Sequence, residues 1–520
     1  MLPAANVQSP ISNLQSPASR EWRWVMIAAA LAVVLASLPY VVVAASTPET
    51  LHFGGLLIHP IDGQSYLAKM RQGFDGAWLL RLPYTAVDEP DVFVYTFYLG
   101  LGHLARVSGL SLTATYHVAR VVGGWLLLIA AYGLVARVFD TLSERRRVWL
   151  FVALTAGLGW LGVEASDLTI PESNTFYSLL TNAHFPFAQA LMLVALTALI
   201  DVGGRAWLQA LAALLALTIL QPFALVTVFA ALGAFLLLRW RRDQKFPRRK
   251  FVLSVLSGLC VAPLLLYLYL ALQSDPILRG WMAQNATPSP PLIGYLIGYG
   301  LMWVLAIPGA RVALRRGRDV DLLLVGWAAT SALLLYAPFP LQRRFALGLH
   351  IPLVLLALLG LKHMVLPRLK GRMKTWIPRV VFALSLPTTL LLLLASSSAA
   401  LRPPDARLFF TRDEAAAFEW LRANVAHDAV VLAAPETGLF LPVWADVRVL
   451  YGHPFETVDA ERMQKLVEQF FGGAIDRAEV LRMQRVRYIF YGPNERALGP
   501  NNFDLTPIFS SGDVLLYQVP

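Results

Sequence analysis

Residues 239–273 read RWRRDQKFPRRKFVLSVLSGLCVAPLLLYLYLALQ. Seven lysine and arginine residues stand in the first twelve positions, and no charged side chain follows in the rest of the stretch. An α-helix needs about 20 apolar residues to cross a bilayer. Lysine and arginine gather in the connections on the cytoplasmic side. The stretch is therefore typical of a membrane-spanning helix that begins at a cytoplasmic connection.

Apolar runs of similar length recur over most of the 520 residues. Only 15% of the residues are charged and the mean hydropathy is +0.56, whereas a soluble domain carries roughly a quarter charged residues. An outer-membrane barrel would show short alternating segments instead. The sequence predicts a polytopic α-helical membrane protein with about eleven transmembrane helices. The runs span 24–46, 112–139, 147–163, 185–202, 206–220, 222–240, 250–272, 291–314, 321–338, 345–361 and 376–398.

The charged connections predict the orientation of these helices. Counting from a cytoplasmic N-terminus places every connection that is dense in lysine and arginine on the inside, as the positive-inside rule requires. We therefore expect a multi-pass protein of the plasma (cytoplasmic) membrane with its C-terminal part outside. The basic connections are 144–147, 239–250, 311–318 and 362–374, whereas 164–184 and 273–290 have almost no lysine or arginine.

Three parts are expected along the chain. A cytoplasmic, disordered tail (1–23) precedes a transmembrane domain (24–400) that contains a long first external loop (47–111). An extracytoplasmic soluble α/β domain (403–520) follows; it has 11 basic and 16 acidic residues, so its net charge is −5 and the remainder carries +16. The high pI therefore reflects orientation in the membrane, and nucleic acid is not an expected partner. The first apolar run is too long for a signal-peptide core of 7–15 residues, which favours a retained helix over a cleaved signal peptide.

The C-terminal segment has the pattern of helices alternating with strands. Thr411 and Glu414 form an expected capping box at the start of a helix, and residues 429–434 (AVVLAA) have the pattern of a short buried strand. Further helices are expected at AERMQKLVEQFF and AEVLRMQRV, and further strands at RYIFYG and DVLLYQV. This order predicts a small, layered, partly parallel sheet.

Several polar side chains at the expected outer face are not explained by apolar packing. The stretch DGQSYLAKMRQG is expected to be helical, with Asp62 and Tyr66 on one face. His184 begins an apolar run, and Arg343 and Arg344 interrupt two runs on the outer side, against the positive-inside tendency. Paired arginines suit the oxygens of a lipid-linked phosphate, although side chains that reach ordinary lipid head groups would give the same pattern.

Three other polar residues are less specific candidates. Arg120, a few residues into the second apolar run, would bind an anion or pair with an acid of the first loop. His453 and Glu456, in YGHPFET (451–457), are expected to face the membrane domain. An ordinary loop without a functional role explains a lone histidine as well.

At these residues the chain resembles the C-type (GT-C) glycosyltransferase superfamily, nearest to the family 39-like group of protein O-mannosyltransferases and aminoarabinose transferases. The resemblance lies in the overall architecture and in an ordered series of features near the N-terminus. The matching features are Asp62, Tyr66, GFDGAWLLRLPY, VFVYTFYLGLG and Arg120.

The resemblance implies an activity and roles for the residues. Members transfer a sugar from a polyprenyl-phosphate donor to an acceptor on the outer face, with inversion. Asp62 matches by position the carboxylate that takes the proton from the acceptor hydroxyl. The candidates for the lipid phosphate, whose developing charge fixed cations stabilise, are Arg343, Arg344, Arg120 and His184.

Asp88, Glu89 and Asp91 have two interpretations. With Tyr66 they would contact the substrate, or the three acids would bind a divalent metal, Mg²⁺ or Mn²⁺. A solvated turn, DEPD, is the other interpretation, because Asp and Pro favour turns. The expected acceptor is a lipid, a glycan or a protein.

Two functions of other classes remain as alternatives. A secondary transporter would show internal repeats and paired helix breaks at mid-membrane depth, which we do not find in the sequence. A non-catalytic membrane scaffold would suit Gly63, which stands where the superfamily usually has a second acid. An oligosaccharide transferase acting on Asn is a related enzyme, but the WWD-like motif typical of that group is absent from residues 403–520.

Overall fold

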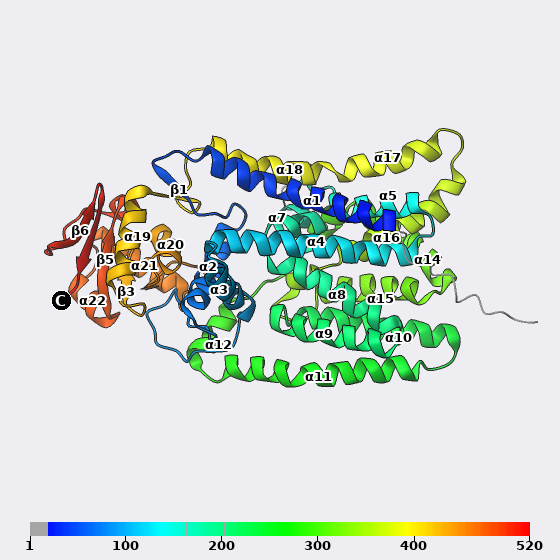
Figure 1. The fold of residues 1–520 in the computed structure, drawn as a ribbon, viewed down its shortest axis with the longest axis horizontal. Coiled ribbons are helices and arrows are strands. Elements are labelled where there is room, and N and C mark those ends of the chain that lie inside the picture. The colour runs from blue at the N-terminus through cyan, green and yellow to red at the C-terminus, as the bar shows by residue number, and fades with distance from the viewer. Residues whose placement is uncertain (1–18, 163, 202) are drawn as a thin grey trace, which may run out of the picture.

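The computed structural model describes residues 19–162, 164–201 and 203–520. Among these residues, seven helices are long and apolar enough to cross a membrane, and α13 (Leu292–Tyr299) with α14 (Leu301–Arg316), bent by 80°, would make an eighth span. The predicted multi-pass helical class is confirmed, whereas a count of eleven spans stays a prediction. Besides α13 and α14, the bundle (Figure 1) consists of the following helices, which include the seven spans: α1 (Ser19–Ser46), α4 (Leu112–Val138), α5 (Leu142–Leu154), α8 (His184–Asp201), α9 (Gly204–Leu220), α10 (Ala224–Asp243), α11 (Arg248–Gln273), α15 (Asp319–Leu334), α16 (His350–Gly360), α17 (Met373–Ser385) and α18 (Pro387–Ser397).

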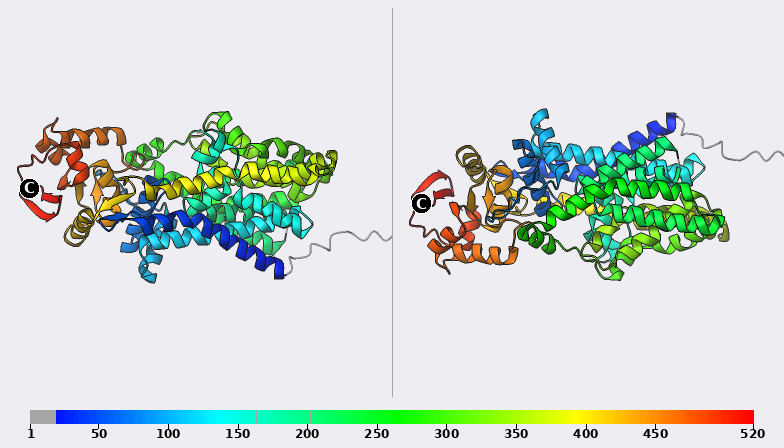
Figure 2. Two further views of the ribbon diagram at one scale, coloured as in Figure 1. Left: turned by 90° about the horizontal axis from the view of Figure 1, so that it is seen from above. Right: turned by 90° about the horizontal axis from the view of Figure 1, so that it is seen from below.

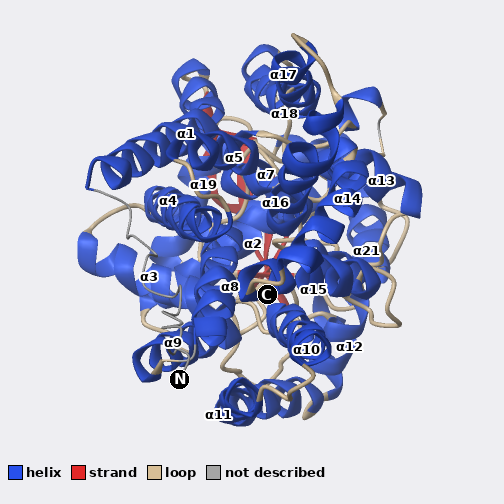
Figure 3. Ribbon diagram, turned by 90° about the vertical axis from the view of Figure 1, so that its right-hand side faces the viewer, coloured by secondary structure: helices blue, strands red, loops and turns tan. Residues whose placement is uncertain are grey.

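The bundle has a buried interior and an apolar outer surface. Seen end-on, α8, α15 and α16 lie inside, whereas α11 and α17 lie at the rim (Figure 3). In the most apolar part of α8, 72% of the residues are buried, against 17% in α11. The outward side chains of α11 include Leu259, Leu266 and Leu270, all more than half exposed. Such an apolar outer surface is suited to lipid.

The start of α1 corrects the predicted tail boundary. Residues 19–23 were expected in a disordered tail, but α1 begins at Ser19. Glu21 is buried and accepts hydrogen bonds from Tyr132 and Arg145. These contacts hold the first turn of the helix against the bundle. The rest of the expected tail, residues 1–18, lies outside the described residues.

The segment after α5 also departs from the prediction. The apolar run 147–163 was expected to form one helix, but α5 ends at Leu154. The chain continues through α6 (Ser166–Thr169) and α7 (Thr175–Leu180). The Asp167 carboxylate accepts hydrogen bonds from the N–H groups of Gly157 (2.9 Å) and Gly159 (3.1 Å). Irregular backbone at membrane depth is tolerated where protein buries it, and every residue of α7 is buried.

Two helices of the first loop pack closely between the bundle and the C-terminal sheet (Figures 1 and 2). They are α2 (Pro60–Asp75), which contains the stretch DGQSYLAKMRQG that was expected to be helical, and α3 (Thr96–Ser108). A Cβ atom on Gly73 would lie 2.0 Å from the Leu99 carbonyl oxygen, and one on Gly102 would lie 2.0 Å from that of Met70. Two glycines thus allow the backbones of α2 and α3 to touch.

The C-terminal segment forms a five-stranded sheet of order β4-β3-β5-β7-β6 among the described residues. Strand β3 is parallel to both of its neighbours, β4 and β5, and the β5–β7 and β6–β7 pairs are antiparallel. The predicted partly parallel sheet and the capping box of Thr411 and Glu414 are confirmed. The elements are β3 (Val430–Leu432), β4 (Arg448–Val449), β5 (Val486–Tyr491), β6 (Pro507–Ser511), β7 (Val514–Gln518), α19 (Arg412–Asn424), α20 (Pro435–Trp444), α21 (Ala460–Gly472), α22 (Arg477–Met483) and α23 (Pro493–Leu498).

The first loop and the C-terminal domain share one hydrophobic core, although the sequence suggested separate units. Strand β1 (Leu51–Phe53) pairs antiparallel with β2 (Phe409–Thr411). The Tyr84 hydroxyl donates to the Leu439 carbonyl at 3.0 Å, and Tyr84 packs in the same cluster as Phe410. The C-terminal domain is therefore fixed to α2 and α3 and does not hang on a flexible linker.

The basic connections gather at one end of the bundle. The connections between α10 and α11, between α14 and α15 and between α16 and α17 lie at the end far from the C-terminal domain (Figure 1). These three basic connections and the C-terminal sheet thus lie at opposite ends of the bundle. This separation matches the arrangement that the charge pattern predicts for a membrane protein with an external C-terminal domain.

Candidate active site

The first turn of α2 presents Asp62 at the junction of the bundle and the C-terminal domain. Its carboxylate is the third residue of the helix, where the positive end of the helix dipole favours a negative charge. The side chain is 45% exposed. His59 caps the helix with φ 50° and ψ 53°, a left-handed conformation that is strained for a non-glycine residue. Its Nε2 lies 3.3 Å from the Tyr177 hydroxyl, which ties the cap to α7.

His453 of the C-terminal domain faces Asp62. The distance from His453 Nε2 to Asp62 Oδ1 is 3.6 Å. Burial alone would raise the pKa of Asp62, but the contact with His453 and nearby positive charges, that of Arg344 among them, hold it below its ordinary value. Asp62 is therefore ionised at neutral pH and keeps an oxygen open to solvent. These are the properties that a proton acceptor needs.

A buried ion pair fixes the loop that carries His453. Lys69 Nζ lies 2.8 Å from Glu456 Oε1, and the two side chains are 1% and 8% exposed. The Ser65 hydroxyl donates to the same oxygen at 2.9 Å. Burial would raise the pKa of Glu456, but the charge of Lys69 and these hydrogen bonds hold it below its ordinary value. The pair joins α2 to residues 451–457 two helical turns after Asp62.

Aromatic rings form a wall beside the carboxylate. The rings of Tyr66 and Tyr98 stack at 4.4 Å between centroids, and His184 meets Tyr66 edge-on at 5.3 Å. The Tyr98 hydroxyl lies 2.6 Å from His184 Nδ1. Lys69 Nζ lies 4.4 Å from the ring centre of Tyr95. Aromatic faces of this kind suit the apolar face of a sugar ring and make cation–π contacts.

Arg343 and Arg344 lie in a short 3₁₀ helix between α15 and α16. Neither guanidinium forms an ion pair or hydrogen bond with a described residue, and both Nε atoms are buried without a partner. Arg344 rests over the Phe223 ring at 5.0 Å. Its charge acts on both Asp62 and Tyr66: it helps to hold the pKa of Asp62 below its ordinary value, and it opposes without overcoming the rise in pKa that burial causes at Tyr66. Arg344 therefore belongs to the Asp62 cluster and keeps donors for an anion.

The acids of the DEPD stretch are placed elsewhere. Arg448 lies 2.9 Å from Asp88 and 3.4 Å from Glu89, and Asp91 pairs with Arg81 at 3.4 Å. Among the residues that the structure describes, no group of three or more His, Cys, Asp or Glu side chains is arranged to hold a metal ion. The Mg²⁺ or Mn²⁺ site considered at these acids does not fit this arrangement, because arginines hold their oxygens. The contacts of Arg448 fasten the first loop to strand β4 of the C-terminal sheet, whereas the Arg81–Asp91 pair lies within the loop.

Arg120 is likewise held by the protein. Its guanidinium donates to the Leu179 carbonyl (2.7 Å) and the Ser37 hydroxyl (3.1 Å) and lies 4.5 Å from the Tyr40 ring. It lines a cavity of about 1510 Å³ between the C-terminal end of α1, the N-terminal part of α4 and helix α19. The α2 residues that line this cavity, such as Phe74, lie on the face opposite Asp62. Arg120 thus joins α1, α4 and α7, away from the Asp62 cluster.

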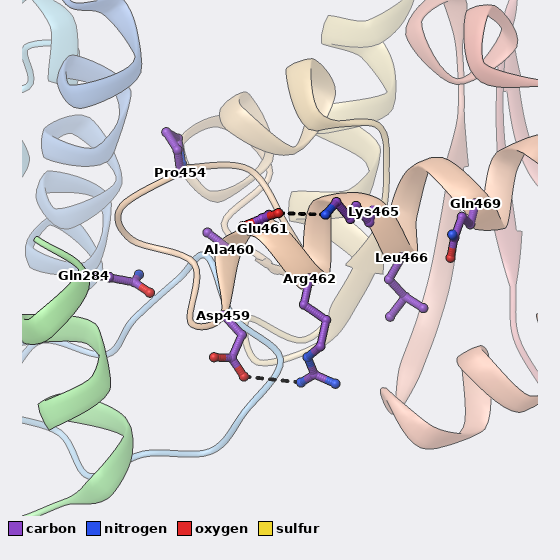
Figure 4. A pocket seen from close by; sticks show the side chains of 9 residues that line it. All are labelled: Gln284, Pro454, Asp459, Ala460, Glu461, Arg462, Lys465, Leu466 and Gln469. Atoms are coloured by element: carbon purple, nitrogen blue, oxygen red, sulfur yellow. Dashed lines mark hydrogen bonds and ion pairs between the residues drawn. The ribbon is translucent and has the colours of Figure 1, made fainter.

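A second cavity, of about 820 Å³, lies between α12 (Pro276–Gln284) and α21. Its charged side chains are already paired with one another (Figure 4): Lys465 with Glu461 at 2.7 Å and Arg462 with Asp459 at 3.4 Å. These pairs are exposed surface contacts that contribute little energy. The cavity offers no group for the transfer of a proton or a phosphate, so the Asp62 cluster is the better candidate.

No family model matches this sequence, and no curated protein matches it. Solved structures do match in fold. The oligosaccharyltransferase AglB from Archaeoglobus fulgidus, in complex with an inhibitory peptide and a dolichol-phosphate, has a TM-score of 0.54 and 13% identity over 91% of this chain and 70% of that chain. ArnT from Cupriavidus metallidurans, bound to undecaprenyl phosphate, has a TM-score of 0.54 and 12% identity over 96% and 98%. This chain has the GT-C glycosyltransferase fold.

A third match has the same fold within a longer chain. The arabinofuranosyltransferase AftD from Mycobacteria has a TM-score of 0.50 and 15% identity over 97% of this chain and 40% of that chain. The GT-C architecture expected from the sequence is thereby confirmed. Identities this low establish the fold, and they leave the donor, the acceptor and the role of each residue to be argued from the site.

Within this GT-C fold, three residues that the sequence did not single out belong to the candidate site. Lys69 anchors Glu456, His59 caps the helix of Asp62, and Tyr95 caps α3 with φ 53° beside Lys69. The spacing of Asp62, Tyr66 and Lys69 at i, i+4 and i+7 was the available signal, because it puts all three on one helix face. A lysine in a loop helix is usually solvated, so Lys69 was not considered as part of a buried site.

Proposed function

We propose that this protein is an integral-membrane glycosyltransferase that moves a sugar from a polyprenyl-phosphate donor to an acceptor, with inversion, at the outer face of the cytoplasmic membrane. The observation that carries the proposal is the pairing of two unlike groups. Asp62 is ionised and accessible, and Arg344, whose guanidinium has no partner among the described residues, is close enough for its charge to act on Asp62. The site thus combines a base for the acceptor hydroxyl, Asp62, with a cation for the donor phosphate, Arg344.

In the proposed reaction, Asp62 takes the proton of the acceptor hydroxyl while the oxygen of that hydroxyl attacks the anomeric carbon of the donor sugar. A carbon–oxygen bond to the acceptor forms, and the bond from the anomeric carbon to the phosphate oxygen breaks. The electron pair leaves with polyprenyl phosphate, whose added charge the guanidinium of Arg344 stabilises. Attack from the side opposite the phosphate inverts the configuration, and Tyr66 and Tyr95 line the space for the sugar.

The solved structures of the same fold support a lipid-phosphate donor. AglB was obtained with a dolichol-phosphate and ArnT with undecaprenyl phosphate. The bundle of this chain has the apolar outer surface that a polyprenyl tail needs. The orientation is part of the proposal: basic connections at the far end of the bundle would face the cytoplasm, which leaves Asp62 and the C-terminal domain outside.

The first test is sugar transfer by the purified protein in lipid nanodiscs. Radiolabelled polyprenyl-phosphate hexoses and pentoses would be supplied with lipid, glycan and peptide acceptors. We expect a labelled product from at least one donor, together with release of polyprenyl phosphate. Uptake of labelled sugar into proteoliposomes without any transfer would favour a transporter, and neither result with any donor would favour a non-catalytic scaffold.

Replacement of Arg344 tests the proposed phosphate contact. We expect Arg344→Gln to lower kcat/KM for the donor by about 10²–10³-fold, the range for loss of one donor to a developing anion. Arg344→Lys should fall between wild type and Arg344→Gln, because lysine keeps the charge and loses the planar fork. The measurement is the initial rate as a function of donor concentration. A normal rate for Arg344→Gln beside a large loss for Arg343→Gln would move the phosphate to Arg343.

A further inference from the structure

The loop 451–457 of the C-terminal domain is held rigidly in place. The Thr457 hydroxyl oxygen accepts hydrogen bonds from the N–H groups of Gly452 (3.4 Å) and His453 (3.3 Å). From α12, the Gln284 amide donates to the Phe455 carbonyl (3.0 Å) and the Thr457 carbonyl (2.6 Å). Together with the Lys69–Glu456 pair, these contacts clamp the loop between α2 and α12.

The hydrogen bonds within this loop determine the tautomer of His453. Its Nδ1 accepts from the backbone N–H groups of Phe455 (3.0 Å) and Glu456 (3.1 Å). An imidazole nitrogen that accepts two hydrogen bonds carries no proton, so the proton of the neutral ring is on Nε2. The ring is 2% exposed, and Nε2 is buried without another partner. The Nε2–H group is therefore aimed at Asp62 Oδ1.

We propose that His453 is a positioning residue for Asp62: the C-terminal domain supplies, through its Nε2–H group, the donor that orients the carboxylate and keeps it ionised. This inference rests on the proposed function, in which Asp62 is the base. A distance of 3.6 Å is long for a hydrogen bond in a site without substrate, and such contacts tighten when substrate binds. His453 cannot itself be the base, because Nε2 already carries a proton and Nδ1 is occupied by two donors.

The other groups that face Asp62 do not replace this donor. The Nε2 atom of His59 lies against the Tyr177 hydroxyl and not against Asp62. Tyr66 and Tyr98 are neutral at physiological pH, because burial raises the pKa of both. Arg344 acts through its charge without a hydrogen bond to Asp62. The titratable and charged groups around Asp62 are His59 just before α2, Tyr66 and Lys69 from α2, Tyr95 and Tyr98 at α3, Tyr116 from α4, His184 from α8, Arg344, and His453 and Glu456 from the loop.

Two variants of His453 separate orientation of Asp62 from folding of the loop. In His453→Asn, the side-chain oxygen can still accept from the N–H groups two and three residues on, as Asn does in turns, but the donor toward Asp62 is lost. In His453→Gln, the amide N–H group can reach about as far as Nε2. The asparagine variant should therefore perturb Asp62, and the glutamine variant should restore it in part.

The pKa of Asp62 is measured by carbodiimide labelling, since only the protonated carboxyl reacts and the side chain is accessible. Mass spectrometry of the peptide that contains Asp62 gives the extent of labelling at each pH. We expect a wild-type midpoint below the ordinary value of about 3.9. In His453→Asn we expect a midpoint higher by roughly 0.5–1 pH unit, with the same shift in the acid limb of kcat/KM and little change in donor KM.

The outcomes distinguish this inference from the proposed function. Equal midpoints in wild type and His453→Asn would overturn the role of His453 even if sugar transfer is observed. A shifted midpoint in a protein that transfers no sugar would support the contact and would contradict the proposed function. If His453→Asn does not fold, the wild-type midpoint decides, and a value at or above the ordinary range overturns the inference.

Discussion

Asp62→Asn is expected to transfer sugar about 10²–10⁴-fold more slowly than wild type, the range for loss of a general base. At 1.36 kcal/mol for each tenfold, this is roughly 3–5 kcal/mol of transition-state stabilisation. Asparagine has the shape of aspartate, and its oxygen still accepts from the His453 Nε2–H group, so the local structure should persist. It cannot accept the proton of the acceptor hydroxyl. The loss should therefore appear in kcat, with the donor KM nearly unchanged.

The chain contains a matched control for this variant on the same helix. Asp75, in the last turn of α2, faces the large cavity on the opposite side and lies outside the Asp62 cluster. Asp75→Asn should leave transfer within about twofold of wild type, since it removes the same charge from α2 without touching the base. Equal activity in wild type and Asp62→Asn would place the base at another residue. Equal losses in both variants would indicate a general effect on α2.

The fold was predictable because its main signals are local. A long apolar run is recognised from composition alone, and the basic connections order the runs. The prediction was wrong for 147–163, because it followed the apolar composition of the run and gave too little weight to Thr155 and the glycines at 157, 159 and 162, which follow the end of α5 at Leu154. Helix α20 was not predicted from the sequence. It is buried on nearly all sides, so it lacks the alternation of polar and apolar faces that marks an amphipathic helix.

The site was less predictable because its contacts join distant parts of the chain. Asp62 and His453 were each selected from the sequence, but their contact brings together residues 391 positions apart, a separation that no local pattern records. The same is true of Asp88 and Glu89, which resemble a solvated turn until Arg448 reaches them from strand β4. Lys69 looked like a surface lysine because its partner comes from the C-terminal domain.

Loss of Lys69 should loosen the C-terminal domain more than any surface change. In Lys69→Met the buried carboxylate of Glu456 keeps its charge and loses its counter-ion, and breaking such a pair costs about 3–5 kcal/mol. The penalty should appear first as local opening of residues 451–457, which this pair joins to α2. Hydrogen exchange measured by mass spectrometry should show exchange of these amides that is faster by roughly 100-fold or more.

The double variant Lys69→Met/Glu456→Gln is the control for this prediction. Glutamine is neutral and still accepts from the Ser65 hydroxyl, so no uncompensated charge remains, and most of the protection should return. Unchanged exchange in Lys69→Met would show that Gln284, Thr457 and strands β1 and β2 suffice to hold the loop. Faster exchange in the double variant than in the single one would contradict a charge-based cause. Because the pair holds His453 against Asp62, Lys69→Met should also lower transfer, and the double variant should recover both properties together.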